Sequence, residues 1–188
     1  MIKRKIFLTG GSGLLGANFT YLFSNVYSIC SLFNLHYIEG NGFQTKQLSY
    51  PKDKKSFVKS VQDYAPDIIF HSGALTNVEK CEREPKKAEV VNFHWTKTIV
   101  DDICLQQSTK LIFISTDQVF KGDKYSYTEE DHPFPLNVYA KTKWKSEDYI
   151  RRFCPNYLIL RVNFFGFGVF QTTFAEWALQ ALTNEKQI

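Results

Sequence analysis

The sequence lacks the features of disulfide-linked, secreted and membrane-spanning proteins. Its four cysteines, Cys30, Cys81, Cys104 and Cys154, lie far apart and form no C-x-x-C pair, so we expect buried, reduced thiols and a cytoplasmic location. No apolar run approaches the ~18 residues of a membrane span. The apolar part of the N-terminus, Ile6 to Leu8, is too short for a signal peptide. These absences predict no membrane partner.

An excess of one charge is also missing. The chain has 23 Lys and Arg against 19 Asp and Glu, a net charge of +4, and its basic residues are scattered, so we predict no nucleic-acid partner. Methionine occurs once against 17 phenylalanines, so the core relies on rigid aromatic rings. With 188 residues, 44% of them hydrophobic and 22% charged, the composition is that of one globular domain, which excludes a disordered or collagen-like chain.

Short apolar runs alternate with longer amphipathic segments. Strands are predicted over 5–9, 27–33, 67–71, 110–115 and 157–161, with a short one near 46–49. Helices are predicted over 14–25, 53–64, 85–107, 137–153 and 172–183. On the first helix, the residues spaced for one inner face are Leu15, Phe19, Leu22, Phe23 and Val26. The alternation predicts an α/β fold, a doubly wound parallel sheet with helices on both faces.

Three glycines follow the first predicted strand in the pattern G-x-x-G-x-x-G. Gly10 permits a tight turn, Gly13 lets the backbone approach a pyrophosphate, and Gly16 lets the next helix pack closely on the sheet. The helix N-terminus offers free N–H groups and a partial positive charge to phosphates. This context predicts dinucleotide binding. Residues Asn34 to His36, after the second strand, include no acid for a ribose 2′-hydroxyl, which favours NADP slightly over NAD.

A second motif is typical of proton transfer. Tyr139 and Lys143 form Y-x-x-x-K on a predicted helix, and this spacing places both on one face. An ammonium group near a phenol lowers the phenol's pKa from about 10 and makes it a usable acid or base. Thr116 follows the strand over 110–115, at the carboxyl end where parallel sheets bind ligands. Its hydroxyl is therefore predicted to contact a substrate oxygen.

Several conspicuous residues are predicted to have structural roles. His71 lies at a strand end among apolar neighbours and is expected to be packed or hydrogen-bonded. Arg161 is expected to anchor its strand end to a carboxylate. Lys141 and Lys145 are expected to be exposed helix charges, and the acidic run 129–131 a solvated loop.

With these motifs in this order, the chain resembles the extended short-chain dehydrogenase/reductases, and among them the dTDP-4-dehydrorhamnose reductase group. The segments that carry the resemblance span nearly the whole chain: FLTGGSGLLG, PDIIFHSGALTNVEKCEREP, FISTDQVFKG, EEDHPFPLNVYAKTKWKSE and LRVNFFG. The resemblance implies a Rossmann-type fold and hydride transfer from a nicotinamide to the C4 keto carbon of a nucleotide-linked 4-keto-6-deoxysugar. In that reaction Thr116 holds the carbonyl, Tyr139 donates the proton, and Lys143 binds the nicotinamide ribose and keeps Tyr139 acidic.

The resemblance also implies a set of residues that bind NADP or NAD. They are Gly10, Ser12, Gly13, Leu14, Leu15, Gly16, Leu48, Ser72, Gly73, Ala74, Tyr139, Lys143 and Asn163. Three positions depart from the family pattern. Gln47 stands where an Asp often precedes Leu48 at the adenine pocket, and Gln118 replaces a Tyr and cannot act as a dehydratase base. Asn18 stands where a glutamate could hold Mg²⁺, so we predict no metal.

Two alternative functions stay open at this stage. Some relatives, including the regulatory β subunit of methionine adenosyltransferase, keep Y-x-x-x-K but serve as cofactor-binding partners of another enzyme; a sugar-nucleotide epimerase is the other reading. The resemblance implies that 1–188 is a cofactor domain, with a substrate lobe starting at about residue 164 and mostly absent from a truncated chain. Such a chain should bind cofactor but turn over poorly. The long helices over 85–107 and 137–153 could form a homodimer.

Overall fold

The computed structural model describes residues 2–169 and 173–183. Its centre is a six-stranded sheet in the order β3-β2-β1-β4-β5-β6, and every neighbouring pair is parallel. The strands are β1 Lys5–Thr9, β2 Ser28–Phe33, β3 Gln44–Gln47, β4 Ile68–His71, β5 Lys110–Thr116 and β6 Tyr157–Val162. The predicted α/β fold is confirmed, and the short third strand lies two residues earlier than expected.

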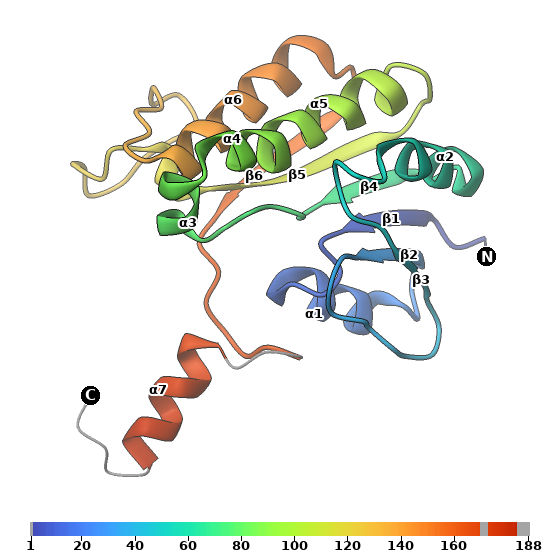
Figure 1. Cartoon of the computed structure of the whole chain (residues 1–188), viewed down its shortest axis with the longest axis horizontal. Helices are drawn as coiled ribbons and strands as arrows, with labels where there is room; N and C mark the ends of the chain where they lie inside the picture. The colour runs from blue at the N-terminus through green and yellow to red at the C-terminus, as the bar shows by residue number, and fades with distance from the viewer. Residues whose placement is uncertain (1, 170–172, 184–188) are drawn as a thin grey trace.

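Helices cover both faces of the sheet, with α1 on one face and α2 to α6 on the other (Figure 1). The helices are α1 Leu14–Phe23, α2 Lys54–Tyr64, α3 Val78–Arg83, α4 Pro85–Glu89, α5 Trp95–Ile99, α6 Val138–Phe153 and α7 Phe174–Thr183. Alternate strand residues enter different cores: Phe7 packs on the α2 to α6 side, whereas Leu8 packs on the α1 side. Strands buried on both faces explain the near-continuous apolar runs.

The inner face of α1 differs in part from the prediction: Leu15 and Phe19 pack against the core as expected, but the other three predicted residues do not. The helix ends at Phe23, and its buried residues are the small Gly16, Ala17 and Thr20. The Thr20 hydroxyl donates to the Gly16 carbonyl over 2.8 Å, so even its polar group is satisfied against the sheet. Leu22 is 70% exposed and Val26 57% exposed. The prediction was wrong for both, and for the 40% exposed Phe23, because close packing requires small residues at the contact.

The helix predicted over 85–107 is a composite. It runs from Pro85 to Cys104 and includes two π-helical segments, η1 Val90–His94 and η2 Val100–Cys104. The short helix α3 precedes it and was not predicted, although the Asn77 side chain caps its start by accepting from the Lys80 N–H over 2.7 Å. Within η1, the Asn92 side chain bonds the Leu75 backbone N–H over 2.7 Å. The π-helical turn therefore ties this helix to the loop that follows β4.

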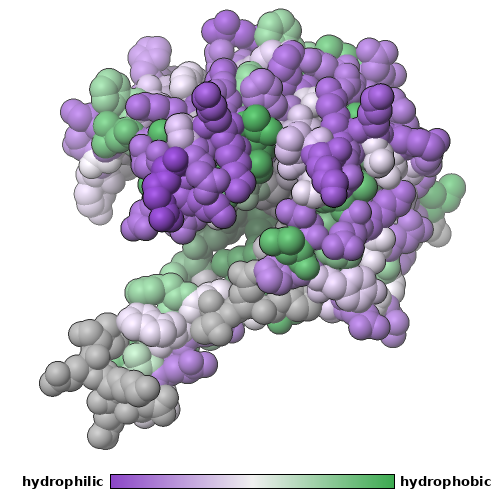
Figure 2. Space-filling model, in the orientation of Figure 1, coloured by the Kyte–Doolittle hydropathy of each residue, from purple (hydrophilic) through white to green (hydrophobic). Residues whose placement is uncertain are grey.

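The last described part of the chain extends from the sheet to α7 (Figure 1). Its aromatic side chains are exposed, including Phe165 at 76% and Phe174 at 69%. Figure 2 shows hydrophobic residues in the hollow between the sheet and this segment. The Asn18 side chain contacts the segment by donating to the Phe167 carbonyl over 3.2 Å. Across residues 2–169 and 173–183, no helix combines the length and apolarity needed to cross a bilayer.

We predict that Gly16→Ala lowers the free energy of unfolding by roughly 1–3 kcal/mol, the usual cost of overpacking. A Cβ at Gly16 would lie 2.2 Å from the Gly10 carbonyl oxygen, so α1 must move away from the turn. Urea denaturation measures the change. Gly13→Ala is the matched control, because its Cβ would lie 3.3 Å from that same oxygen. Equal stability of the two variants would contradict the close-packing argument.

Candidate functional site

The glycine turn between β1 and α1 forms one wall of the site. Gly10 has a φ of +75°, and a Cβ there would lie 2.7 Å from the Gly73 nitrogen, so a side chain has no room. The Gly13 N–H donates to the Gly10 carbonyl over 3.0 Å. Helix α1 begins at Leu14 with Gly13 as its N-cap and without a side-chain cap. Its first N–H groups therefore remain available to an anionic ligand.

The segment after β4 forms the neighbouring wall. The Ser72 hydroxyl donates to the Thr9 carbonyl over 2.7 Å, and the Gly73 N–H donates to the Thr9 hydroxyl over 3.1 Å. These bonds place Ser72, Gly73 and the half-buried Ala74 beside the glycine turn. Towards the β3 edge of the sheet, the Leu48 N–H donates to the Phe33 carbonyl over 3.0 Å. Leu48 is half-buried and packs against the core.

The predicted proton-transfer residues come together where β5 meets α6. Thr116 is the last residue of β5 and is 5% exposed, whereas Tyr139 lies in the first turn of α6 and is 8% exposed. The Thr116 side chain acts on the pKa of the Tyr139 phenol, so the two groups are neighbours. The Asn137 side chain caps α6 by accepting from the Ala140 N–H over 2.7 Å, which fixes the turn that carries Tyr139.

The acidity of Tyr139 differs from the prediction. Burial raises the pKa of the Tyr139 phenol above its ordinary value, and the neighbouring Thr116 side chain opposes this change. The predicted lowering by Lys143 is wrong for this structure. The Lys143 Nζ lies 4.0 Å from the centre of the Phe113 ring instead. Tyr139 therefore keeps its proton at neutral pH, as a proton donor must.

Lys143 is a buried cationic side chain. It is 2% exposed, and burial lowers the pKa of its ammonium group to about 7, while the Glu147 carboxylate acts in the opposite direction. By contrast, Lys141 and Lys145 on the same helix are exposed, as predicted, and Lys145 forms an ion pair with Glu89. Of these three lysines on α6, only Lys143, the lysine of Y-x-x-x-K, is buried.

Polar side chains extend the site along the carboxyl ends of β5 and β6. Asn163, just after β6, donates to the Asp117 carboxylate over 3.0 Å, and Thr116 donates to the other oxygen of Asp117 over 3.2 Å. Gln118 accepts from the Asn137 side-chain amide over 3.0 Å. Sequence reasoning missed Asp117 and Asn137. The position of Asn137 before the apolar-periodic segment was a readable N-cap signal.

His71 has the structural role that the sequence predicted. It is 1% exposed, with Nδ1 2.7 Å from the Thr9 hydroxyl and Nε2 3.1 Å from the Thr96 hydroxyl. Burial holds the pKa of this imidazole well below its ordinary value, and the charge of Lys143 lowers it further. The His71 ring is therefore a buried, neutral group, held by two hydrogen bonds, and its role is structural.

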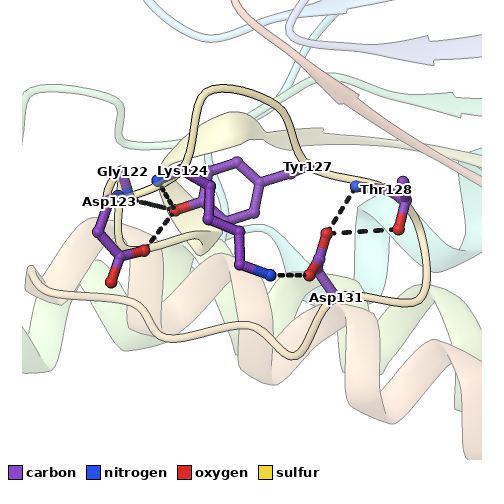
Figure 3. A network of polar contacts seen from close by, with 6 residues as sticks. All are labelled: Gly122, Asp123, Lys124, Tyr127, Thr128 and Asp131. Carbon is purple, nitrogen blue, oxygen red and sulfur yellow. Dashed lines mark hydrogen bonds and ion pairs between the residues drawn. The ribbon is translucent and has the colours of Figure 1, made fainter.

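A cavity of about 750 Å³ is lined by Asp117, Gln118 and Asn137 and continues along β6. Residues of the loop from Phe120 to Leu136 line part of it. Figure 3 shows how the loop holds its shape: the Tyr127 hydroxyl accepts from the backbone N–H groups of Gly122 and Asp123, both over 2.8 Å. Asp131, from the predicted acidic loop, forms an ion pair with Lys124 (Figure 3). This wall of the cavity is therefore stabilised within the loop itself.

Comparisons with known proteins agree with this geometry. Residues 4–188 match a family described as the RmlD substrate binding domain. The β subunit of methionine adenosyltransferase 2 from Danio rerio is 33% identical over 170 residues, which cover 85% of this chain and 47% of that protein. A dTDP-4-dehydrorhamnose reductase from Sinorhizobium fredii is 35% identical over 111 residues, 58% of this chain and 37% of the relative. The chain thus spans about half the length, or less, of these curated relatives.

Solved structures show the same similarity. A hypothetical dTDP-4-dehydrorhamnose reductase from Sulfolobus tokodaii has a TM-score of 0.75 at 31% identity, covering 84% of this chain and 55% of its own. The Bacillus anthracis dTDP-4-dehydrorhamnose reductase in complex with NADP has a TM-score of 0.79 at 26% identity, covering 100% and 62%. A UDP-glucose 4-epimerase from Thermotoga maritima has a TM-score of 0.84 at 20% identity, covering 98% and 64%, and shows the fold alone.

We predict that Lys143→Met stabilises the protein at pH 7 by a few kcal/mol, since each unit of pKa depression corresponds to about 1.4 kcal/mol. The lysine has a pKa of about 7 in the native state. Between that pH and about 10 the unfolded chain binds more protons at this residue, so wild-type stability rises with pH over that range. Chemical denaturation at several pH values measures the effect.

The matched control is Lys141→Met, an exposed lysine on the same helix, which should change stability by no more than about 0.5 kcal/mol. If Lys143→Met proved as neutral as Lys141→Met at pH 7, the inferred burial of the ammonium would be wrong.

Proposed function

Because the chain belongs to the RmlD substrate binding domain family, we propose that it is an NAD(P)H-dependent reductase of a nucleotide-linked 4-keto-6-deoxysugar. One observation carries the proposal: Thr116 at the carboxyl end of β5 and Tyr139 and Lys143 on one face of the adjacent α6 are all buried. They adjoin a cavity of about 750 Å³ through Asp117 and Gln118. The family itself supports the coarser statement that the protein is of oxidoreductase type.

The residues present fit a nicotinamide dinucleotide. Gly13 is exposed at the uncapped start of α1, where N–H groups can donate to a pyrophosphate. In the proposal, Ser12 to Gly16 hold the pyrophosphate, and Ser72 to Ala74 lie along the ribose of the nicotinamide half. Leu48 borders the adenine and Asn163 the nicotinamide. The exposed residues after β2, Asn34 to His36, carry no acid, which favours NADP slightly.

The chain's own residues would act on the ketone oxygen. The bound cofactor supplies a hydride to the keto carbon. Thr116 donates a hydrogen bond to the oxygen, and Tyr139, which holds its proton at neutral pH, transfers that proton to the developing alkoxide. The product is the alcohol, and Tyr139 is left as a phenolate. The resemblance gives Lys143 the role of stabilising this phenolate, for which its Nζ would have to leave the Phe113 ring. Solvent then returns the proton to Tyr139.

A second function is favoured by a specific observation. The β subunit of methionine adenosyltransferase 2 from Danio rerio matches 85% of the chain at 33% identity, a wider match than that of the Sinorhizobium fredii reductase. On this alternative, the same cofactor site serves a subunit that binds nicotinamide cofactor without consuming it. Turnover separates the two functions, because only the reductase oxidises NAD(P)H in the presence of a keto-sugar nucleotide.

Gly13→Asp should weaken NADPH binding by at least about tenfold while leaving stability unchanged or raised by a few tenths of a kcal/mol. An Asp at this N-cap satisfies the start of α1 but places a negative charge against the phosphates. NADPH fluorescence titration and thermal denaturation without cofactor measure the two effects. Gly13→Asn is the control, since it caps without charge and should bind more tightly than Gly13→Asp. Equal binding by wild type and Gly13→Asp would place the dinucleotide elsewhere.

Tyr139→Phe in the full-length protein should lower kcat for keto-sugar reduction by about 10²–10⁴-fold, the usual contribution of a general acid. Its affinity for NADPH should change much less, because the cofactor's phosphates lie at α1. Tyr125→Phe, at a fully exposed tyrosine, is the matched control. Unchanged reduction in Tyr139→Phe would refute the mechanism. NADPH binding by wild type without reduction of any keto-sugar nucleotide would favour the subunit function.

A further inference from the structure

A buried carboxylate lies one helical turn beyond Lys143. Glu147 on α6 is completely buried, whereas carboxylates in proteins are almost always exposed unless they are paired. It follows Lys143 by four residues, as Lys143 follows Tyr139. The three side chains therefore form one buried stripe along α6, with Tyr139 at the site and Glu147 two turns inside.

Glu147 connects α6 to both strands beneath it. It receives three hydrogen bonds from the Arg161 guanidinium on β6, at 2.8, 3.1 and 3.2 Å. The Ser115 hydroxyl on β5 donates to it, and Arg151 on α6 donates over 2.9 Å. Ser115 and Arg161 are paired across the sheet in the β5–β6 register. One carboxylate therefore holds the helix against two neighbouring strands.

These contacts lie directly beside the reacting groups. Ser115 immediately precedes Thr116, so a bond to Ser115 also fixes the backbone that carries the Thr116 hydroxyl. Resting on the function proposed above, we propose that Glu147 is a positioning residue for this reaction: its bonds to Ser115 and Arg161 set α6 on the sheet so that Tyr139 and Lys143 meet Thr116. Glu147 itself lies too deep to touch a substrate.

The charge of Glu147 acts on Lys143 as well. Of the groups around Lys143, β4 contributes the neutral His71, α6 contributes Tyr139 and Glu147, and β6 contributes Arg161, which is bound to Glu147. β5 contributes the uncharged Phe113 and Ser115. Glu147 is the anion that opposes the effect of burial on the Lys143 ammonium. Its removal should therefore let Lys143 lose its proton at a lower pH.

The test is a titration of Lys143 in the full chain by carbon-13 NMR of labelled lysines, with the Lys143 signal assigned by its loss in Lys143→Met. In Glu147→Gln the midpoint should fall by at least about one pH unit, a tenfold change in the deprotonation constant. Asp148→Asn is the matched control: it removes one carboxylate from the next position of α6, where Asp148 is partly exposed and pairs with Arg152. Its Lys143 midpoint should stay at the wild-type value.

A second variant covers the case in which Glu147→Gln does not fold because Arg161 is left unpaired. Glu147→Met combined with Arg161→Met replaces the buried Glu147–Arg161 pair with apolar side chains, a change that folded proteins often tolerate. Arg151, the other partner of Glu147, is 36% exposed and can be hydrated. The double variant should also lower the Lys143 midpoint, but by less than Glu147→Gln does, because the Arg161 cation is lost together with the anion that acts on Lys143. Circular dichroism confirms the fold of each variant. A wild-type midpoint in either folded variant would overturn the proposal.

Kinetics of the full-length protein complete the test. Glu147→Gln should lower kcat at pH 8 more than at pH 6, with a smaller change in KM, and Glu147→Asp, which keeps the charge, should restore part of the loss. A merely structural role would lower activity equally at both pH values and would contradict the proposal. Absence of any reduction by wild type would refute the proposed function instead, and the NMR midpoints would still decide whether the Glu147 carboxylate acts on the Lys143 ammonium.

Discussion

The burial of one charged side chain, the Lys143 ammonium, is the constraint on which the rest of the site depends. A buried ammonium is costly unless other groups compensate for lost hydration. Here the Phe113 ring lies 4.0 Å from the nitrogen, and the Glu147 carboxylate supplies the opposite charge. That carboxylate is itself completely buried, so it needs partners of its own. Arg161 and Ser115 supply them, and the placement of α6 on β5 and β6 follows.

A second constraint acts at the carboxyl ends of β1 and β4, where two backbones approach each other closely. Gly10 and Gly73 leave no space for a side chain between the two turns, and the Trp95 ring lies where a Cβ on Gly73 would be. The Thr9 hydroxyl bonds His71 and the Gly73 N–H in the same region. These contacts fix the shape of the glycine turn, which would limit the conformational entropy lost if the proposed phosphate bound there.

The helix that carries Tyr139 is also linked to the loop that encloses the cavity. The Arg161 guanidinium, bound to Glu147, lies 4.7 Å from the centre of the Phe120 ring. Phe120 stacks on Tyr127 at 4.3 Å, and Tyr127 organises the loop through its hydroxyl. The Arg161 guanidinium therefore contacts both the carboxylate of α6 and an aromatic side chain of the loop that borders the cavity.

The sequence by itself determined the parallel sheet, the glycine turn and the placement of Tyr139 and Lys143 on one face of a helix. Hydrophobic periodicity and local spacing are properties of residues that are close in the chain, so they can be read without the fold. It also anticipated that Arg161 would meet a carboxylate, but not which one. Only the tertiary structure decided that the partner is Glu147 and that Leu22 faces solvent. These outcomes depend on contacts between residues far apart in the chain, and on how closely a helix packs, which no local pattern records.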